Sequence, residues 1–356
     1  MRGRMNLHHS LCFRLIIVAL LFIQFTGYYG EICSPELISF GQWERANIQR
    51  KQFPCHFNPS DLPHENATYK IAPSPPRYFH VNRKIYEYTG VNGAIFTIDV
   101  SRSCDCDFNA STLLTVSERE KWIWKPEFCS AMEWNATEFC RILGHRRILT
   151  IGDSTQSQAT VSLINLINYS LDFANCSDHI SHHWTPHLTE YTSISSEHGN
   201  DTYLNRLIRD SRADIIIFGV GPHYHNVSHF ETDVDNLIQE IYRLNEIYTP
   251  KKQFIWKSIS APHGDCEKFH EPIHSTSPYQ HALQIFSWDY FPLYDEYARL
   301  RIRENGIEFM DMYPLKLRPD AHVGSYGGGD IHSDCNHYCL PGPVSVFAIL
   351  LMHFLI

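Results

Sequence analysis

Two short segments of this chain, far apart in the sequence, hold the residue types of a serine-based acyl-transfer site. The first, RRILTIGDSTQSQ, starts as an apolar, strand-like run and ends in a polar turn that contains Ser154. The second, IHSDCNHYCLPG, places Asp334 three residues before His337. A serine hydroxyl becomes a strong nucleophile when a histidine accepts its proton and an acid orients that histidine. The two segments therefore predict a catalytic site of Ser154, His337 and Asp334.

Spacing alone leaves other roles open for these residues. A Gly-Asp-Ser turn is also a common helix start, in which the Asp or Ser side chain caps free N–H groups. Two rival Asp/His pairs lie nearby in RPDAH and GGDIH. On spacing, either could supply the acid and the base: Asp320 with His322, or Asp330 with His332.

An acyl-transfer site also needs hydrogen-bond donors for the oxyanion that forms on the attacked carbonyl, and losing one typically costs about 3 kcal/mol. The backbone N–H of Ser154 is one candidate, because this residue begins the helix after the turn. The loop GVGPHY is expected to supply others, because its glycines allow close backbone approach. The residues expected to form the oxyanion and substrate loops are Gly152, Asp153, Gly219, Gly221 and His223.

Composition limits the partners of this 356-residue chain. Its net charge of −9 and pI near 6.2 provide no basic field for nucleic acid. The 22 histidines are scattered, and a zinc site would need them at ligand geometry. We expect no metal and no bound cofactor, although two clusters leave zinc open as an alternative: His179/His182/His183 and His223/His225/His229.

The N-terminal segment predicts entry into the secretory pathway. Residues 15–30 carry no charge, are dominated by LIIVALLFIQF, and follow a short basic stretch at residues 1–14. Such a segment is a signal anchor, with residues 1–14 in the cytosol, or a cleaved signal peptide. Either alternative places the rest of the chain in the lumen.

Sequons and cysteines agree with a luminal location. Ten of the eleven cysteines follow residue 30, and an even number suits disulfides in an oxidising compartment. Residues 31–145 hold many of them together with several prolines, which predicts an irregular, disulfide-rich N-terminal region. The expected N-glycosylation sites are Asn66, Asn109, Asn135, Asn168, Asn175, Asn200 and Asn226.

From residue 146 to residue 356 the pattern alternates between strands and helices. Short apolar runs predict strands at Ile148–Ile151, Ile215–Val220, Phe254–Ile259 and Ile307–Met312. Helical spacing lies between them at Ser157–Asn168, Val234–Tyr248 and Ser287–Glu304. Buried strands that alternate with helices predict a parallel sheet covered on both faces, with the site at the carboxyl ends of its strands. The final run, VSVFAILLMHFLI, is expected to form a buried helix.

Taken together, GDSTQSQ, GVGPHY, LRPDAH and DCNHYCLPG resemble the PC-esterase branch of the SGNH/GDSL superfamily. This branch includes the trichome-birefringence-like glycan O-acetyltransferases of plants and the sialic acid O-acetyltransferases. The upstream segments FGQWER and KWIWKPEFC are similar to elements of the plant family's N-terminal region. The resemblance implies an SGNH-hydrolase-like three-layer α/β fold with a central parallel sheet. It also implies a type II membrane protein of the Golgi, with a luminal catalytic domain.

The resemblance assigns roles to individual residues. It implies Ser154 as nucleophile, His337 as base and Asp334 as the orienting acid, and it gives the pair Asp320/His322 a supporting role. The plant enzymes carry Asn-Thr-Gly-His-Trp in the glycine loop, where their Asn donates to the oxyanion. This chain has Gly219 at that place, so the resemblance leaves the third oxyanion donor unassigned.

The leading hypothesis for function is transfer of an acetyl group to a glycan hydroxyl through an acetyl-serine. The alternatives are a carbohydrate or lipid O-acyl esterase with the same triad, and an inactive glycan-binding protein. The expected location is the Golgi membrane, and a secreted protein is the alternative. The donor cannot be identified from a motif, and acetyl-CoA is one candidate. Three aromatic residues either line a sugar groove or belong to the core: Trp184, Trp256 and Trp288.

Overall fold

The computed structural model describes residues 32–46, 69–71, 85–89, 95–99, 122–168, 176–192, 194–195, 201–274, 287–322, 334–340 and 342–356. Several predictions lie outside these residues: the segment 15–30, the pair Asp330/His332, the side chain of Asn168, and the sequons at Asn66, Asn109, Asn175 and Asn200. Within the described part of the chain, no helix has both the length and the apolar character needed to cross a membrane.

The centre of the molecule is a five-stranded sheet in which all neighbouring strands are parallel. Its order is β12 (Glu308–Met310), β11 (Gln253–Lys257), β10 (Ile215–Gly219), β6 (Ile148–Gly152) and β7 (Ile180–Trp184). Every residue of β6 and β10 is buried. Strands enclosed on both faces need continuous apolar sequence, which explains the ILTIG and IIIFG runs.

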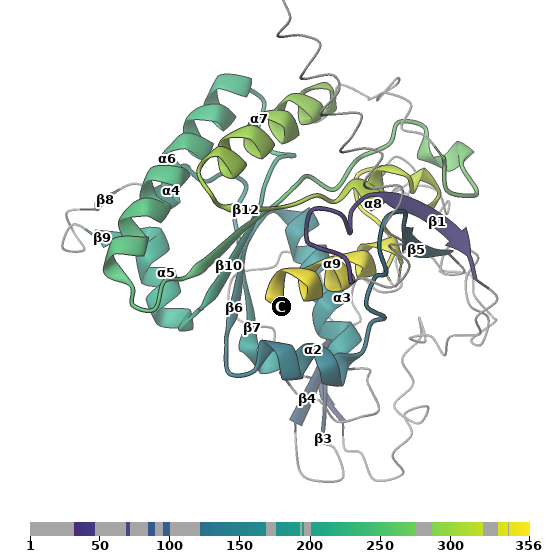
Figure 1. Cartoon of the computed structure of the whole chain (residues 1–356), viewed down its shortest axis with the longest axis horizontal. Coiled ribbons are helices and arrows are strands. Elements are labelled where there is room, and N and C mark those ends of the chain that lie inside the picture. The colour runs from purple at the N-terminus through teal and green to yellow at the C-terminus, as the bar shows by residue number, and fades with distance from the viewer. Residues whose placement is uncertain are drawn as a thin grey trace, which may run out of the picture.

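Helices cover both faces of this sheet, which gives three layers (Figure 1). Alternate strand residues belong to two separate cores, as period-2 side-chain alternation requires. One core, with Ile148 and Ile215, lies against α2 (Ala136–Leu143), α3 (Ser154–Asn168) and α9 (Val346–Leu355). The other, with Leu149 and Ile216, lies against α5 (Tyr203–Ser211), α6 (Val227–Ile247) and α7 (Phe291–Glu304). The three-layer α/β fold expected from the sequence is confirmed.

The direction in which strands are added to the sheet reverses between β6 and β10. After β6 the chain adds β7 on one side, and it then returns to build β10, β11 and β12 on the other side. Ligands of open α/β sheets bind at such a reversal, outside the carboxyl ends of the strands. Gly152 and Gly219 are register partners at these two ends.

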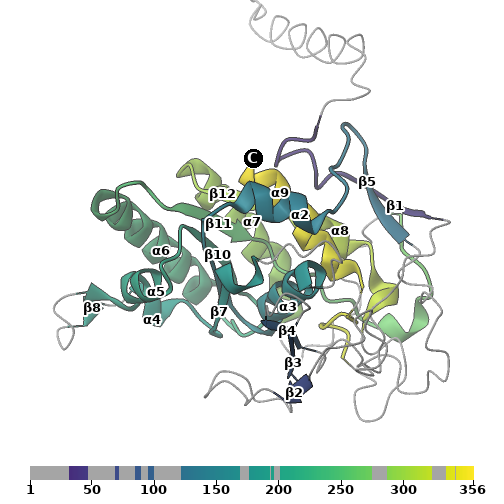
Figure 2. The same cartoon turned by 90° about the horizontal axis from the view of Figure 1, so that it is seen from below.

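The N-terminal region forms two small antiparallel sheets. One pairs β1 (Gly41–Arg45) with β5 (Trp122–Pro126), and the other contains β2 (Tyr69–Ile71), β3 (Ile85–Thr89) and β4 (Ile95–Asp99). Figures 1 and 2 show them at separate places, the first beside α8 (Tyr313–Lys316) and the second next to α3. Disulfides are expected in this region, and Cys33–Cys129 is one of them.

The C-terminal helix α9 is buried, as expected from its apolar sequence. Its His353 Nδ1–H donates to Cys33 O (2.8 Å), while Met132 N–H donates to Nε2 (3.2 Å). These bonds join α9 to the N-terminal region. The remaining short elements are α4 (Thr189–Thr192), β8 (Ile194–Ser195), β9 (Asp201–Thr202) and the 3-10 turns Ser177–His179, Cys266–Lys268, Trp288–Tyr290, Pro319–Ala321 and Pro343–Ser345.

Candidate active site

Ser154 lies at this reversal of strand order, at the first residue of α3 and two residues after β6 ends. The approach of β6 to β10 there requires glycine, because a Cβ on Gly152 would lie 2.0 Å from Gly219 O. Asp153 N–H donates to the same Gly219 carbonyl (3.3 Å). The turn therefore presents Ser154, which is half-buried, at the carboxyl ends of the two strands. The N–H groups of a first helical turn have no partner within the helix.

His337 and Asp334 meet Ser154 in one hydrogen-bonded chain. His337 Nε2 lies 2.7 Å from Ser154 Oγ, and His337 Nδ1 lies 2.9 Å from Asp334 Oδ2. A carboxylate can only accept, so Nδ1 carries the hydrogen and Nε2 is left to accept the serine proton. The two residues come from segments 183 positions apart. The arrangement has the geometry that activates a serine.

Asp334 is held in its ionised form. Burial raises its pKa, but hydrogen bonds from the His337 ring and the charge of that ring outweigh burial, and backbone N–H groups add to them. The N–H groups of Asn336 and His337 both donate to Oδ1, at 3.2 and 2.9 Å. The result is a pKa lowered to about 2. A carboxylate ionised at neutral pH is what orients an imidazole and stabilises its protonated form.

Asp153 has a different position from the one expected. Its side chain is fully buried, and its Oδ1 accepts from Thr155 N–H (2.8 Å) and Thr155 Oγ1 (2.7 Å). Its Oδ2 accepts from Gly221 N–H (3.1 Å). Asp153 therefore ties the serine turn to the glycine loop. The Gly221 N–H, expected to serve the oxyanion, already has a partner in this carboxylate.

The side chains packed against position 219 explain why it is a glycine. A Cβ at this position would come within 2.2 Å of Gln156 Oε1 and 2.8 Å of Lys257 Cε. Gln156 is fully buried, and neither its amide nitrogen nor its amide oxygen has a hydrogen-bond partner among the described residues. Gln156 and Lys257 therefore fill the space that an asparagine side chain would need.

Lys257 is a buried cation beside the same turn. Its Nζ donates to Ser258 O (3.0 Å). Burial lowers its pKa to about 8, against the opposing attraction of Asp153 and Asp295. A lysine with a pKa near neutrality is only weakly held in its charged form, so the field that it exerts on the turn depends on pH.

The loop that carries His337 is clamped onto α3. Gln158 Nε2 donates to Tyr338 O (2.9 Å), and Tyr338 N–H donates to Gln158 Oε1 (3.2 Å). The Tyr338 hydroxyl reaches the carbonyl oxygens of Ala261 (2.7 Å) and Leu315 (2.9 Å). An amide that both donates to and accepts from one residue fixes its position along the helix. No sequence pattern indicates this role for Gln158.

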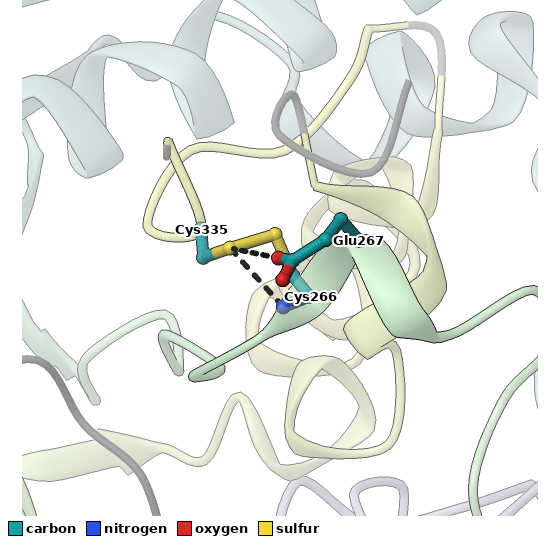
Figure 3. A group of neighbouring side chains, drawn as sticks. All are labelled: Cys266, Glu267 and Cys335. Carbon is teal, nitrogen blue, oxygen red and sulfur yellow. Dashed lines mark hydrogen bonds between the residues drawn. A yellow bond between two sulfur atoms is a disulfide. The ribbon is translucent and has the colours of Figure 1, made fainter. Parts of the chain in front are cut away.

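Disulfides hold the same loop from its other side. Cys335 pairs with Cys266, and Cys339 is also disulfide-bonded, as predicted for these two flanking cysteines. Figure 3 shows Glu267 beside the Cys266–Cys335 bond. Among the described residues these three form the one group of side chains close enough to share a metal ion. Disulfide sulfur is not the thiolate that binds metals, so the group is a covalent clamp.

The rival pair Asp320/His322 lies behind the loop, away from Ser154. Asp320 forms a buried ion pair with Arg318 (2.8 Å). His322 Nδ1 contacts the carbonyl oxygen of His337 (3.1 Å), and its Nε2 lies 2.7 Å from His263 Nδ1. These contacts place His322 against the loop that carries His337.

The two described sequon asparagines cap helices. Asn135 Oδ1 accepts from Glu138 N–H (2.9 Å) at the start of α2, and Asn226 Oδ1 accepts from His229 N–H (3.2 Å) at the start of α6. Both residues are exposed. A glycan joins asparagine through its nitrogen, so either cap is compatible with glycosylation.

Comparisons with known proteins find one matching family and several relatives. Residues 217–354 match the family described as "PC-Esterase: GDSL/SGNH-like Acyl-Esterase family found in Pmr5 and Cas1p". This range contains Asp334 and His337 and begins after Ser154. Two curated relatives, both from Arabidopsis thaliana, align over longer stretches. Protein trichome birefringence-like 38 is 23% identical over 62% of this chain and 69% of its own length. Xyloglucan O-acetyltransferase 1 is 21% identical over 66% and 70%.

A solved acetyl xylan esterase also aligns with the chain, at 16% identity over 58% of this chain and 98% of its own. The TM-score of this alignment is 0.36.

Proposed function

We propose that this chain, in which residues 217–354 match the PC-esterase family, transfers an acetyl group to a glycan hydroxyl through an acetyl-serine on Ser154. The observation that carries the proposal is the 2.7 Å contact between His337 Nε2 and Ser154 Oγ, backed by Asp334. The relatives include xyloglucan O-acetyltransferases. These names favour acyl transfer to a carbohydrate over other reactions of a serine triad.

The first half of the reaction forms the acetyl-serine. Ser154 Oγ attacks the carbonyl carbon of the donor while His337 Nε2 takes the hydroxyl proton, and Asp334 stabilises the imidazolium. Collapse of the tetrahedral intermediate breaks the bond to the leaving group, which receives the proton from His337. The Ser154 N–H is the proposed donor to the oxyanion. The acetyl donor is open, with acetyl-CoA as one candidate.

The second half transfers the acetyl group. A sugar hydroxyl loses its proton to His337 as its oxygen attacks the acetyl carbonyl, and the proton returns to Ser154 as the ester to the enzyme breaks. Water in place of the sugar would make the chain an esterase, which is the alternative. An inactive glycan-binding protein is the second alternative. The intact hydrogen-bonded chain through His337 favours an enzyme over it.

The proposal extends to the compartment. We place the chain at the Golgi membrane, anchored through residues 15–30, with the catalytic part in the lumen, and a secreted form is the alternative. Disulfides such as Cys140–Cys176 support an oxidising compartment. Protection of the catalytic part from added protease in sealed Golgi vesicles, lost on adding detergent, tests the orientation. Digestion without detergent would contradict it.

The purified chain, acetyl donors and a glycan panel test the reaction. Mass spectrometry should find an acetyl group on Ser154 and on sugar products, and both should disappear in Ser154→Ala. Ser162→Ala, a buried serine of the same helix, serves as the matched control and should retain both. Loss of acetyl from acetylated sugars, without any gain, would identify the esterase. Glycan binding without either product would identify the inactive protein.

A further inference from the structure

One tryptophan stands apart from the others. All seven tryptophans are described, and Trp184 alone is exposed, at 38%. Two of the aromatic residues that could have lined a sugar groove, Trp256 and Trp288, are buried at 1% and 3% and belong to the core. An indole that is exposed to water lacks the stabilisation that burial would provide. An exposed tryptophan beside a reactive centre is therefore a candidate binding surface for a ligand.

Trp184 stands directly beside the serine turn. It ends β7, and its register partner across the sheet is Gly152, two residues before Ser154. Ile148 and Ile180, register partners at the start of the same strands, both lie in the core on the α3 side. Side chains alternate along a strand, so Trp184 also belongs to the α3 side. This is the side on which α3 begins with Ser154.

His223 extends the surface from the glycine loop. Its ring meets the Trp184 indole edge to face, with centroids 6.0 Å apart and planes at 75°. The ring is half-buried and close enough to Asp153 and His337 for their charges to act on it. Burial lowers the pKa of His223, which favours a neutral ring with one N–H donor and one acceptor nitrogen.

A hydrogen bond from His187 holds the backbone of His223. His187 Nε2–H donates to His223 O (2.9 Å), and the His187 ring packs edge-on against Tyr224 (4.7 Å). The Tyr224 hydroxyl in turn donates to buried Asp233 (2.7 Å). Groups that bind a sugar with defined orientation need such rigid support, because a loose side chain loses entropy on binding.

We propose that Trp184 and His223 form the acceptor subsite, which holds one sugar ring of the glycan beside Ser154. The C–H face of the sugar packs on the indole, whose π-face is negative, and a ring hydroxyl hydrogen-bonds to the His223 imidazole. The neighbouring hydroxyl then faces the acetyl carbonyl on Ser154. The inference rests on the proposed acetyl transfer, and it names the group that makes sugar rather than water the acceptor.

Partition of the acetyl-enzyme is the sharpest test. Acetyl-enzyme is formed first and then mixed with oligosaccharide, and mass spectrometry measures acetyl-sugar against free acetate. We expect Trp184→Ala to shift the ratio toward acetate tenfold or more and to raise the KM for acceptor more than it lowers kcat. Trp184→Phe should recover most of the ratio, since it restores an aromatic face. His223→Ala should shift it in the same direction, and His223→Gln, which keeps a donor, should shift it less.

The matched control is Phe128→Ala. Phe128 is 50% exposed and follows β5, which pairs with β1 and not with the central sheet. It should leave the partition unchanged. A Trp184→Ala enzyme with the wild-type ratio would overturn the inference. So would a parallel loss of acetyl-serine formation and transfer, because that pattern marks a structural support.

A binding measurement separates this inference from the reaction itself. Saturation-transfer NMR with neutral and sialylated oligosaccharides reports contact without turnover, in the Ser154→Ala background. Binding that disappears in Trp184→Ala supports the subsite even if no acetyl-serine ever forms on the wild-type chain. Binding of no oligosaccharide, or binding unaffected by Trp184→Ala, overturns it.

Discussion

Replacing Asp334 with asparagine removes one charge and keeps the shape of the side chain. The native contacts lower the pKa of this carboxyl from 3.8 to about 2. At about 1.4 kcal/mol per unit, and allowing for partial solvent exposure, the ionised form contributes about 2 kcal/mol to folding at pH 7. A group with a depressed pKa stabilises the fold above its unfolded value, so this contribution fades as pH falls from about 4 to 2.

The same substitution should disable the serine. An asparagine amide can donate to His337 Nδ1, which favours the tautomer with its hydrogen on Nε2, and that nitrogen can no longer accept the serine proton. A change of this kind lowers the rate of the reaction by about 10⁴-fold. Urea unfolding at pH 7 and the rate of acetyl-serine formation measure the two effects. Asp210→Asn, an exposed carboxylate, is the control. An Asp334→Asn chain with the wild-type urea midpoint and a rate within tenfold of wild type would refute the reasoning.

Three further substitutions test the supports of the site. Gly219→Asn should lower the free energy of unfolding by about 1–3 kcal/mol, because the new side chain overpacks against Gln156. Adding Gln156→Ala should recover part of this loss, and strictly additive shifts of the urea midpoint in the double variant would contradict the reasoning. Replacing Cys266 and Cys335 by serine opens a link across 69 residues and should lower stability by about 2–4 kcal/mol, seen as a lower melting temperature. Arg318→Met leaves its buried carboxylate partner unpaired and should cost about 3–5 kcal/mol; an unchanged unfolding midpoint would be inconsistent with that burial.

Four strands of the sheet were predictable because most residues of each are buried and apolar, which leaves a short apolar run in the sequence. β7 was not predicted. It is an edge strand of sequence ISHHW, and its histidines are only half-buried. His182 Nδ1 lies 2.9 Å from Thr150 Oγ1, a cross-strand contact that no periodicity reveals. The start of α6 was placed seven residues late, because its first two turns are polar and the signal is the Asn226 cap.

The residues of the site that lie in recognisable sequence motifs were predictable. Ser154, Asp334 and His337 come together as expected, but spacing could not separate this acid–base pair from Asp320/His322. The structure separates them because Asp320 forms a buried ion pair with Arg318, two residues before it. Two other supports join segments distant in sequence and carry no local pattern: the Gln158 clamp on the loop, and the bond from Gly221 N–H to Asp153.

The distances in sequence that the fold bridges bear on how it forms. The bond from His337 to Ser154 joins residues 183 apart, and that from His353 to Cys33 joins residues 320 apart. Such closures cost chain entropy before they return any contact, which slows folding. We expect the sheet to form first and the serine to gain its base only after the Cys266–Cys335 link is made. Refolding in which the sheet and the capacity to form acetyl-serine return at one rate would contradict this order. A chain whose sheet has formed while the Cys266–Cys335 link is still open would then be a folding intermediate that cannot form acetyl-serine.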